Sequence, residues 1–496
     1  RVASTANERL LTEIWGRFFS LNSVDIDQNF FALGGDSIVA IQVIASLKQQ
    51  GFVLNSQQIF NYPTIAELAP LIKHLNNQTF APLIDQHSLP LSPMQRWYLD
   101  SLQGSSALDE SINAPSPYFT QSVLLKTPVN ASSAQILTAL RTVIEGSAQF
   151  GLRFKQTMSD GGQNHWQQSL VEQRSLYWLE VADMQTSVAD IADVLRARID
   201  IEKGPLFAAA WINGSQGASR LLLVAHHLVI DAVSWRLFIQ RLSNNMIMSN
   251  TATEDDLFIR WLSDLTGRAA AISENEARYW ADIESTFSQG FIMVDPFVSN
   301  TVLDERCETV YVCEDVTQAI LSSANVSYNT RPEELLLASW WLTCQRYVDN
   351  ANLCLKIEIE KHGRSNDVGD ALGWFTSLYP LLLSVSESPF IDPVAHAIYV
   401  SKEASRAVPK QGMGYGLLKY MRPDALSVEQ KTLQEHQDSR ALSMVFNYLG
   451  QAGEATDSDH DFAFLDEYLG KERDLNAERF SDLELTSVVH RGRLRL

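Results

Sequence analysis

Three short stretches of the sequence carry side chains that could do chemistry together. Gly34-Gly35-Asp36-Ser37 places a serine hydroxyl at the start of an apolar helical pattern, where a covalent group could be attached. His226 and His227 lead into Asp231, and a third stretch reads Glu360-Lys361-His362-Gly363-Arg364. An imidazole and a carboxylate are the pair that a proton-transfer site needs. The combination indicates an enzyme that works on a substrate held covalently by its own chain.

Each stretch also has a purely structural interpretation. Asp36 and Ser37 could act only as helix caps, because a side-chain oxygen at a helix start satisfies orphan N–H groups. A bare pair of histidines is often two packed or exposed side chains, and a Glu-Lys-His run is often a solvated strand end. The order of the three stretches and the residues around them must therefore decide whether each stretch has a catalytic or a purely structural role.

Residues 1–75 have the pattern of a small all-helical domain. Apolar residues recur at helical spacing over Asn7–Phe19 and again over Ser37–Gln50. A capping box at Thr64 opens a last helix. Pro70 conflicts with the continuation of that helix, because proline lacks the N–H that a helix interior uses. No strand is expected in this domain.

Strand patterns alternate with helical ones in the rest of the chain. The polar residues 76–88 are interpreted as a linker, and residues 89–496 as an α/β domain too large for one core. Two lobes are expected, at about 89–250 and 251–496, with the polar segment Ser249–Glu254 as their crossover. The predicted strands are Tyr118–Leu125, Ser219–Ala225, Thr309–Val312, Leu353–Ile359, Leu381–Val385, Ser443–Tyr448 and Leu483–Val489. Two of these strands end directly before the histidine pair and the Glu-Lys-His run. Catalytic groups often lie at such strand ends.

Composition argues against several classes of function. The 496 residues carry 39 basic and 59 acidic side chains, a formal charge of −20, which disfavours nucleic acid or an anionic membrane as partner. The 4 cysteines form no CxxC pair, and no histidines have zinc-ligand spacing, so no metal site is expected. Sparse cysteines and the lack of an apolar run of about 20 residues predict a cytoplasmic protein. Because the chain starts at Arg1 and ends at Leu496 inside a strand pattern, it is expected to be a segment of a longer polypeptide.

The first stretch resembles the attachment site of peptidyl carrier proteins from nonribosomal peptide synthetases. The resemblance rests on the run from Asp25 to Ser37 and extends across the helical bundle to Asn61-Tyr62-Pro63-Thr64. It implies that Ser37 carries 4′-phosphopantetheine, added by a phosphopantetheinyl transferase, and that its thiol holds an aminoacyl or peptidyl thioester. Asp36 stands where many carriers have histidine, which is typical of carriers that precede an epimerization domain.

The histidine pair resembles the HHxxxDxxSW signature of condensation and epimerization domains in the same synthetases. The resemblance implies that His227 is the catalytic histidine, that His226 supports it, and that Asp231 has a structural role. In the family this aspartate pairs with an arginine. Arg153, in the sequence Gly151-Leu152-Arg153, is the predicted partner, although the residues before it depart from the family's pattern.

The third stretch resembles the EGHGRE motif, which marks epimerization domains and which condensation domains lack. Glu360 then corresponds to the family's catalytic glutamate. Lys361 stands where glycine is usual, and Ser365 replaces the final glutamate. The charge of Lys361 could lower the pKa of the neighbouring carboxylate, and its side chain could crowd the backbone.

Four weaker motifs follow in the family's order. They are Leu91–Trp97, Gly373–Pro380, Gly412–Gly416 and Val445–Gln451. The glycines of Gly412–Gly416 lack the strand–turn–helix context of a phosphate loop. In the last motif, Asn447 and Tyr448 are candidate hydrogen-bond donors to the oxygen of a thioester substrate.

The resemblances imply a small all-α four-helix carrier domain followed by a large α/β two-lobed domain of the chloramphenicol-acetyltransferase-like fold. The implied reaction is inversion of the α-carbon of the tethered thioester, with His227 and Glu360 acting on opposite faces. It requires no metal or pyridoxal cofactor, and the implied neighbours are an upstream adenylation and a downstream condensation domain. A peptide-bond-forming condensation domain and a catalytically decayed interaction module are the alternatives. The sequence leaves open which amino acid is epimerised, and which of the two groups removes the proton.

Overall fold

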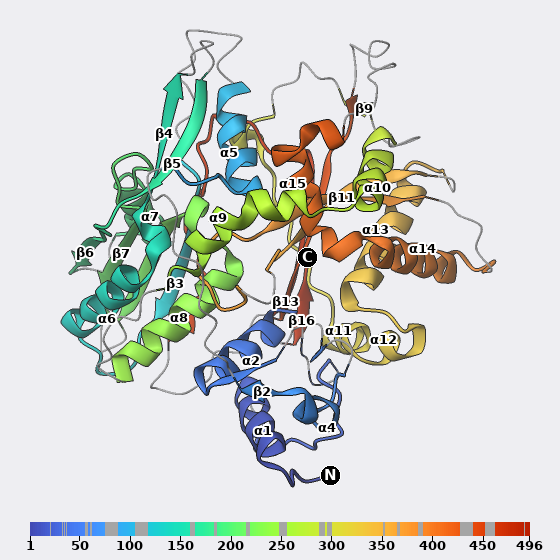
Figure 1. The fold of residues 1–496 in the computed structure, drawn as a ribbon, viewed down its shortest axis with the longest axis horizontal. Helices are drawn as coiled ribbons and strands as arrows, with labels where there is room; N and C mark the ends of the chain where they lie inside the picture. Colours follow the sequence, from blue (N-terminus) through green and yellow to red (C-terminus); the bar gives the residue numbers. More distant parts are fainter. Residues whose placement is uncertain are drawn as a thin grey trace.

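The computed structural model shows a small N-terminal helical unit beside a larger domain with two sheets (Figure 1). It describes the chain except for residues 20, 32, 34, 36, 55–57, 60–61, 75–87, 105–117, 159–163, 183–185, 215–218, 248–254, 287–292, 295–299, 351–352, 365–367, 385–389, 427–439, 452–461 and 491. Asp36, Ser365, the predicted crossover Ser249–Glu254 and all but the last residue of the predicted linker at 76–88 therefore lie outside the described residues. Among the described helices, none is long and apolar enough to cross a membrane.

The N-terminal unit packs short helices around a shared apolar core. Helix α1 (Ala6–Phe18) begins at a capping box made by Thr5 and Glu8. Helices α2 (Ser37–Gln49) and α4 (Ile65–Leu68) pack against it. Three α-helices of this unit are described along their length and residues 58–59 are also helical, so the expected four are not confirmed.

Two details of this unit differ from the sequence prediction. Strands β1 (Phe52–Val53) and β2 (Lys73–His74) form an antiparallel pair, which corrects the expectation that no strand forms here. Helix α4 ends early and continues as the 3₁₀ turn η1 (Ala69–Leu71), which holds Pro70 in its first positions. Proline is tolerated in a first turn, where its missing N–H is not needed, so the conflict is resolved by shortening the helix.

The first lobe of the large domain is built on a five-stranded sheet. Its strands are, in order, β14 (Ala463–Phe464), β3 (Thr120–Lys126), β8 (Arg220–His226), β7 (Phe207–Ile212) and β6 (Tyr177–Val181). Its two faces are covered by α6 (Ser133–Gly146) and α8 (Ala232–Ile247) on one side and α7 (Val188–Arg196) on the other. Burial on both faces explains the unbroken apolar runs in β7 and β8.

The second lobe has its own five-stranded sheet, and its two faces differ in character. The strands are, in order, β11 (Ser377–Leu383), β10 (Leu355–Lys361), β13 (Met444–Gln451), β15 (Leu483–His490) and β16 (Arg493–Arg495). One face is apolar and packs on α13 (Pro332–Tyr347) and α14 (Pro393–Ala407). Residues of the opposite face, such as Leu378, pack toward the first lobe.

The remaining elements connect or cover the two sheets. The helices are α5 (Pro93–Gly104), α9 (Leu257–Ala270), α10 (Glu274–Ser285), α11 (Glu314–Leu321), α12 (Ser323–Tyr328) and α15 (Met413–Met421). Two further strand pairs are β4 (Leu152–Met158) with β5 (Asn164–Leu170), and β9 (Met293–Val294) with β12 (Arg440–Ala441). The 3₁₀ turns are η2 (Ala148–Gly151), η4 (His227–Val229), η5 (Val302–Asp304), η6 (Pro409–Gly412) and η7 (Pro423–Ala425).

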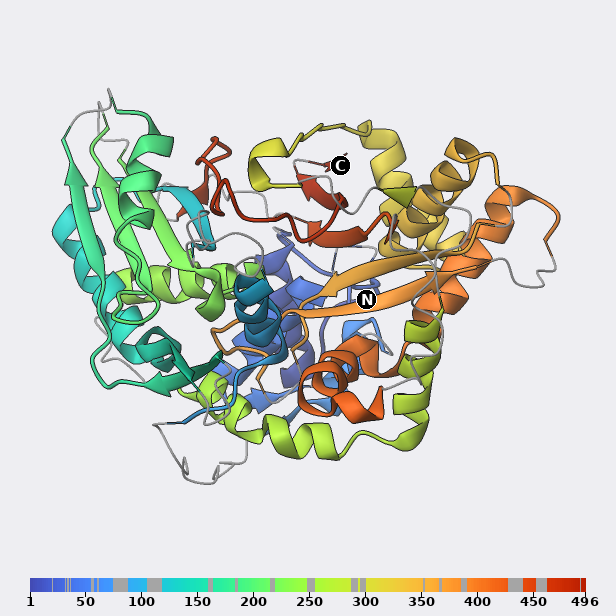
Figure 2. The same ribbon diagram turned by 90° about the horizontal axis from the view of Figure 1, so that it is seen from above.

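The two lobes exchange segments. Strand β14 comes from the C-terminal part of the chain but pairs with β3 at the edge of the first sheet, and Figure 2 shows this red segment reaching across. Apolar residues of α9 and of the segment 368–375 belong to the core of the first lobe. A cut near residue 250 therefore does not separate the two packing units, and the surface between the lobes is built from both halves of the chain.

Candidate active site

His227 lies where the central strand of the first sheet ends. Strand β8 stops at His226, and the next residue opens the turn η4. The imidazole of His227 is buried between the rings of Phe119 and Trp374, with centroid distances of 4.7 and 4.4 Å. Burial lowers the pKa of His227 to about 4, against a weaker opposing effect of the Asp231 charge. The imidazole is therefore neutral near neutral pH.

A chain of three side chains decides which ring nitrogen of His227 carries the proton. Trp235 Nε1 donates to Gln121 Oε1 at 3.1 Å, and Gln121 Nε2 lies 2.8 Å from His227 Nε2. An indole N–H and an amide NH₂ can only donate, so Nε2 of the imidazole must accept and the proton sits on Nδ1. Nδ1 is buried and has no partner among the described residues. The neutral His227 thus keeps its lone pair on Nε2.

His226 shapes the turn that holds its neighbour. Its Nδ1 accepts a hydrogen bond from the backbone N–H of Leu228 at 3.2 Å, and its ring is buried beside Tyr98. A side chain that caps a turn in this way fixes the direction in which the next residue points. That His226 supports His227 stays a proposal. The hydrogen bond from Leu228 is the contact through which it would do so.

Asp231 and Arg364 form a buried clasp between the two lobes. Arg364 Nη1 and Nη2 donate to the two carboxylate oxygens at 2.7 and 3.0 Å. The backbone N–H groups of Ser234 and Phe375 donate to the same oxygens at 2.8 and 3.0 Å. Burial alone would raise the pKa of Asp231, but the Arg364 charge and these hydrogen bonds hold it below its ordinary value. Gly363 permits the turn before Arg364, because it has a φ of 56° and a Cβ there would strike the Phe375 carbonyl.

The predicted pairing of Asp231 with Arg153 is wrong. Arg153 Nη1 donates to the backbone carbonyls of Phe150 and Leu152 at 3.2 and 2.7 Å. Its guanidinium also lies against Gly204, where a Cβ would come within 2.4 Å of Nη2. These local contacts hold Arg153 on the β4 hairpin. The arginine that Asp231 needs comes instead from the Glu-Lys-His stretch, four residues after Glu360.

Glu360 lies near the C-terminal end of β10, on the face of the second sheet that packs toward the first lobe. Along β10, Ile357 and Ile359 point into the apolar core, so the alternation of a strand turns Glu360 to the other face. There it pairs in register with Asn447, whose amide hydrogen-bonds to its carboxyl group. Burial raises the pKa of Glu360 to about 7, with smaller contributions from the charges of Glu484 and Asp231. Near neutral pH this carboxyl group can therefore either hold or release a proton.

The two predicted oxygen-stabilising donors lie on different faces of β13. Asn447 belongs to the face that carries Glu360. Tyr448 is the next residue, and its ring packs against the apolar core of the second lobe. Because successive residues of a strand alternate, the two cannot both point at one substrate oxygen. Asn447 orients the carboxyl group of Glu360, and the contacts described for Tyr448 give it a packing role.

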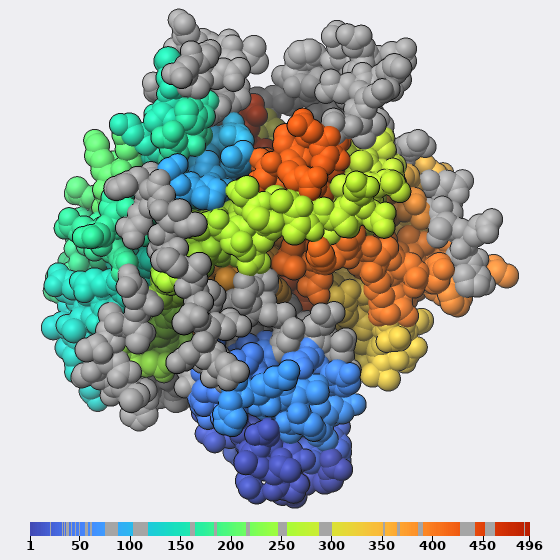
Figure 3. All heavy atoms as spheres, in the orientation of Figure 1, coloured from blue at the N-terminus to red at the C-terminus, as the bar shows by residue number. Residues whose placement is uncertain are grey.

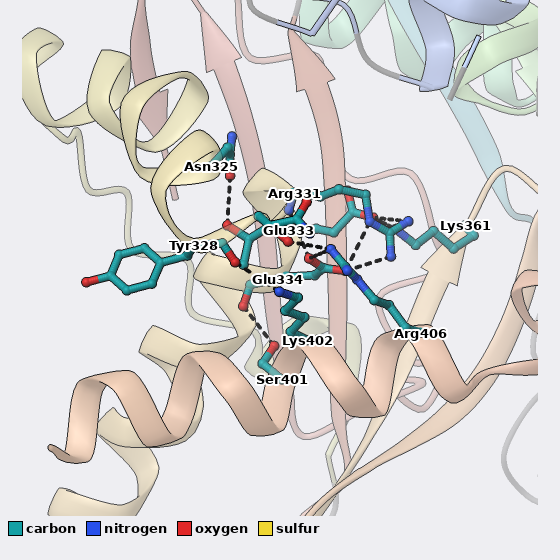
Figure 4. Close-up of polar contacts among 11 residues, drawn as sticks. Asn325, Tyr328, Arg331, Glu333, Glu334, Lys361, Ser401, Lys402 and Arg406 are labelled. Atoms are coloured by element: carbon teal, nitrogen blue, oxygen red, sulfur yellow. Dashed lines mark hydrogen bonds and ion pairs between the residues drawn. The ribbon is translucent and has the colours of Figure 1, made fainter. Parts of the chain in front are cut away.

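The side chain of Lys361 points away from the proposed site. It lies on the face of β10 opposite Glu360, and its Nζ is 2.9 Å from a carboxylate oxygen of Glu333 on α13 (Figure 4). Burial would raise the pKa of Glu333, but the charges of Lys361 and Arg331 lower it to about 2. The expectation that Lys361 lowers the pKa of Glu360 is therefore wrong, since that pKa is raised. Glu333 pairs with the positive charge of Lys361, the residue that stands where the family usually has glycine.

Asp231 is a charged neighbour that the imidazole of His227 and the carboxyl group of Glu360 share. The charge of Asp231 acts on both, because it raises the pKa of His227 and that of Glu360. Asp231 follows His227 by four residues and Arg364 follows Glu360 by four, so the clasp joins the two chain segments that carry these groups.

Comparison with known proteins assigns this architecture to a family. Residues 85–496 match the model described as Condensation domain. The chain belongs to the condensation-domain family. Residues 9–72 match the model described as Phosphopantetheine attachment site, so the condensation-family domain is preceded by a carrier domain for 4′-phosphopantetheine. The resemblance to a synthetase carrier followed by a domain of the condensation and epimerization superfamily is confirmed.

The relatives of this condensation-family chain are far longer than it is. It is 27% identical to tyrocidine synthase 1 of Brevibacillus parabrevis, over 90% of this chain but 40% of the relative. It is 26% identical to surfactin synthase subunit 1 of Bacillus subtilis (strain 168), over 92% of this chain and 13% of the relative. The chain therefore spans less than half the length of either synthase.

Solved structures of both kinds of domain share the fold of the condensation-family domain. The epimerization domain from the third module of tyrocidine synthetase B superimposes with a TM-score of 0.65 and 23% identity, covering 84% of this chain and 92% of that one. The starter condensation domain of rhizomide synthetase gives a TM-score of 0.59 and 17% identity, covering 82% and 88%. The shared fold is consistent with the expected two-lobed architecture and leaves the choice between the two reactions to the site.

The carrier domain presents Ser37 as the first residue of α2. A Cβ on Gly35 would come within 2.3 Å of the Phe30 ring, so the loop before Ser37 lies close against the carrier core. The start of a 13-residue helix favours a phosphate group, since its free N–H groups and dipole are positive. These features fit 4′-phosphopantetheine. Lys48, on the same helix, lies 2.7 Å from Asp370, which joins the carrier to the segment that also carries the clasp.

Two residues of the site were missed by sequence reasoning. Arg364 was part of a recognised motif, and its position next to that motif's glutamate was the signal that could have assigned it. Gln121 sits inside an otherwise ordinary strand pattern, and no local signal marks it. Its contact with His227 spans 106 residues, so only the folded arrangement of β3 beside β8 reveals it.

Proposed function

We propose that this chain epimerises the α-carbon of an aminoacyl or peptidyl thioester carried by Ser37. The observation that carries the proposal is Glu360, a carboxyl group on the face of β10 that packs toward the first lobe, whose pKa is raised to about 7 by burial. Peptide-bond formation has no use for a second acid or base at this place, whereas inversion of a stereocentre needs one on each face. Buried carboxyl groups tuned toward neutrality are characteristic of proton-transfer sites.

The division of the chain follows from the same proposal. Residues 1–75 form the carrier domain, 76–88 the linker, and 89–496 the epimerization domain. An adenylation domain loads the carrier, and a condensation domain that prefers the D epimer uses the product. Because the tether makes every encounter intramolecular, the site needs little affinity for a free amino acid.

The reaction is a proton removal followed by a proton return. When bound to Ser37, 4′-phosphopantetheine holds the substrate as a thioester, which acidifies the α-hydrogen. One group takes the α-proton, and the electron pair of the C–H bond moves toward the thioester oxygen. The other group then delivers a proton to the opposite face of the same carbon. His227 and Glu360 are the proposed pair, and repeated turnover gives a mixture of epimers.

The two pKa values assign the starting proton. Between about pH 4 and pH 7, His227 is neutral and Glu360 is protonated, so the pair holds one proton. His227 Nε2 is then the base and the Glu360 carboxyl group the acid. Gln121 occupies the lone pair of Nε2 until the substrate's hydrogen takes its place. Reaction in the other direction uses the same pair after the proton has moved to the imidazole.

The activity should therefore follow a bell-shaped pH profile. Below about pH 4 both groups are protonated and no base remains, and above about pH 7 both are deprotonated and no ready acid remains. We expect the rate of α-proton exchange to rise through the first value and fall through the second. Gln121→Glu should move the acidic limb upward by about 1–3 pH units, because a carboxylate beside Nε2 favours the imidazolium ion.

A matched control is available for this shift. Gln167 Nε2 lies 3.0 Å from Nε2 of the exposed His165, a second contact between a glutamine and a histidine, on the β4–β5 hairpin. Gln167→Glu should leave both limbs of the profile in place. An acidic limb that stays put in Gln121→Glu would contradict the assignment of His227 as the base.

Deuterium incorporation separates epimerisation from the alternatives. The carrier is loaded with an L-aminoacyl pantetheine, incubated in D₂O without any acceptor, and the released amino acid is examined by mass spectrometry and chiral chromatography. We expect deuterium at the α-carbon and both stereoisomers. A condensation domain or a decayed interaction module would leave the substrate in the L form without deuterium.

Loading of the carrier tests the attachment site separately. Incubation with coenzyme A and a phosphopantetheinyl transferase should add the mass of one phosphopantetheine to the wild-type chain and none to Ser37→Ala. Ser23→Ala changes an exposed serine of the same domain and should load normally. A mass gain in Ser37→Ala would place the attachment site elsewhere.

A further inference from the structure

A cavity of about 270 Å³ lies beside the proposed site. It is enclosed by α5, α9, α15 and the strands β10 and β11, and Figure 3 shows the three helices next to one another on one face of the molecule. Most of its wall is apolar, including Met94, Trp97, Trp261, Leu265, Leu378 and Leu417. A wall of this kind is suited to the apolar stem of a small organic group.

The cavity adjoins the strand that carries the proposed acid. Glu358 lines it, and this residue lies on the same face of β10 as Glu360, about 7 Å along the strand. Leu378, which also lines it, is the register partner of Glu360. On the other side, the Trp97 ring packs 6.4 Å from Trp374, the ring that covers His227. The cavity therefore lies next to the strand position of the proposed acid and next to the ring that covers the proposed base.

Glu358 is a charged group of the wall that remains available to a ligand. It forms no hydrogen bond or ion pair with any described residue, although it is largely enclosed. Two lysines lie near enough to act on its charge, but Lys356 pairs with Glu284 at 3.8 Å and Lys419 donates to the Tyr415 hydroxyl at 3.1 Å.

The other charged groups of the wall already have partners. Lys410 pairs with Glu276 at 3.1 Å. Arg268 pairs with Asp264 at 3.0 Å. A carboxylate that faces an apolar cavity without a partner is stabilised by a ligand that brings a hydrogen-bond donor or a positive charge.

We propose that this cavity receives the side chain of the tethered amino acid, and that Glu358 favours a side chain ending in an amine. The inference rests on the proposed function, because the place of the α-carbon is taken from Glu360 and His227. The unbranched aliphatic stem of such a side chain would lie along the apolar wall. The aromatic rings of Trp97, Trp261 and Tyr420 in the same wall suit a cationic end group.

The test compares two amino acids that differ only in the end of the side chain. Ornithine carries an amine where norleucine, of the same length, carries a methyl group. Their stable pantetheine amides are titrated into the full chain by calorimetry, and their carrier-bound thioesters are followed by deuterium exchange. We expect the wild type to prefer ornithine by about 10- to 100-fold in both measurements, as for a hydrogen bond to a charged group. Glu358→Gln should bring the ratio close to one.

A control variant and two outcomes separate the assignment of Glu358 from the proposed epimerisation. Glu403→Gln removes an exposed carboxylate of α14 and should keep the wild-type ratio. Equal binding of the two amides, or a preference that survives Glu358→Gln, overturns the assignment of Glu358. If wild type prefers the ornithine amide and Glu358→Gln loses that preference, the assignment of Glu358 is supported. If, in addition, neither thioester exchanges deuterium, the assignment of Glu358 stands and the proposed epimerisation fails.

Discussion

Glu360→Gln is expected to lower the rate of α-proton exchange about 10²–10⁴-fold, the usual contribution of one positioned acid or base. The substitution keeps the size of the side chain and a hydrogen bond to Asn447, but the amide can neither hold nor release the proton at stake. Exchange is measured on the carrier-bound thioester in D₂O at pH 6, inside the window in which the pair holds one proton. A circular dichroism spectrum and a melting temperature equal to the wild type would show that the fold survives.

Glu484→Gln is the matched control for this loss. Glu484 lies on β15, which β13 separates from the strand of Glu360 in the same sheet, and its charge contributes to the raised pKa of Glu360. Removing that charge should lower the pKa of Glu360 and move the alkaline limb of the pH profile downward, with exchange retained at pH 5. Wild-type exchange by Glu360→Gln would remove Glu360 from the mechanism and with it the case for epimerisation.

The second large effect is expected at the clasp. Arg364→Met should destabilise the large domain by about 3–5 kcal/mol, because it leaves the buried carboxylate of Asp231 without its counter-ion. Asp231→Asn should cost a similar amount, because it leaves the guanidinium charge buried. The double variant should recover part of the loss, since neither charge then remains alone. Thermal and urea unfolding of the four chains measure these differences.

The position of the clasp makes two further outcomes informative. Lys155→Gln breaks an exposed ion pair with Glu202 at 3.9 Å and should cost less than about 1 kcal/mol. Arg153→Met should behave differently from Arg364→Met, with no recovery when combined with Asp231→Asn. If Arg153→Met and Asp231→Asn were coupled instead, the described pairing would be incorrect.

The stabilisation by the clasp should depend on pH in one direction. Because the folded-state pKa of Asp231 lies below its ordinary value, its contribution is fully present above about pH 4 and declines as the pH falls through the folded pKa. The difference in stability between wild type and Asp231→Asn should therefore narrow only in acid. A difference that narrowed on raising the pH would indicate a different titrating group.

Much of the site could be predicted from the sequence because its chemistry is local. The end of an apolar strand before His227 and the alternation that exposes Glu360 both follow from spacing within a few residues. The turn at Gly363 follows in the same way, since only glycine enters that backbone region easily. The carrier domain was also recognisable, because its motif and its helix pattern occupy one continuous stretch.

The wrong and missing parts share one physical origin. Asp231 and Arg364 are 133 residues apart, and Gln121 and His227 are 106 apart, so no local pattern links them. The choice of Arg153 followed a motif with the right residue type but on a hairpin where backbone carbonyls already bind the guanidinium. Lys361 was expected to disturb Glu360 until the fold showed Glu333 on α13 beside it.

By itself, the sequence determined which groups are proposed to react, the strand and helix that carry them, and the presence of a carrier domain. The tertiary structure alone decided which arginine neutralises Asp231, which nitrogen of His227 is basic, and why the carboxyl group of Glu360 titrates near neutrality. The reason is the range of the interactions. Backbone geometry acts between near neighbours in the chain, whereas desolvation and charge pairing depend on what two distant strands bury between them.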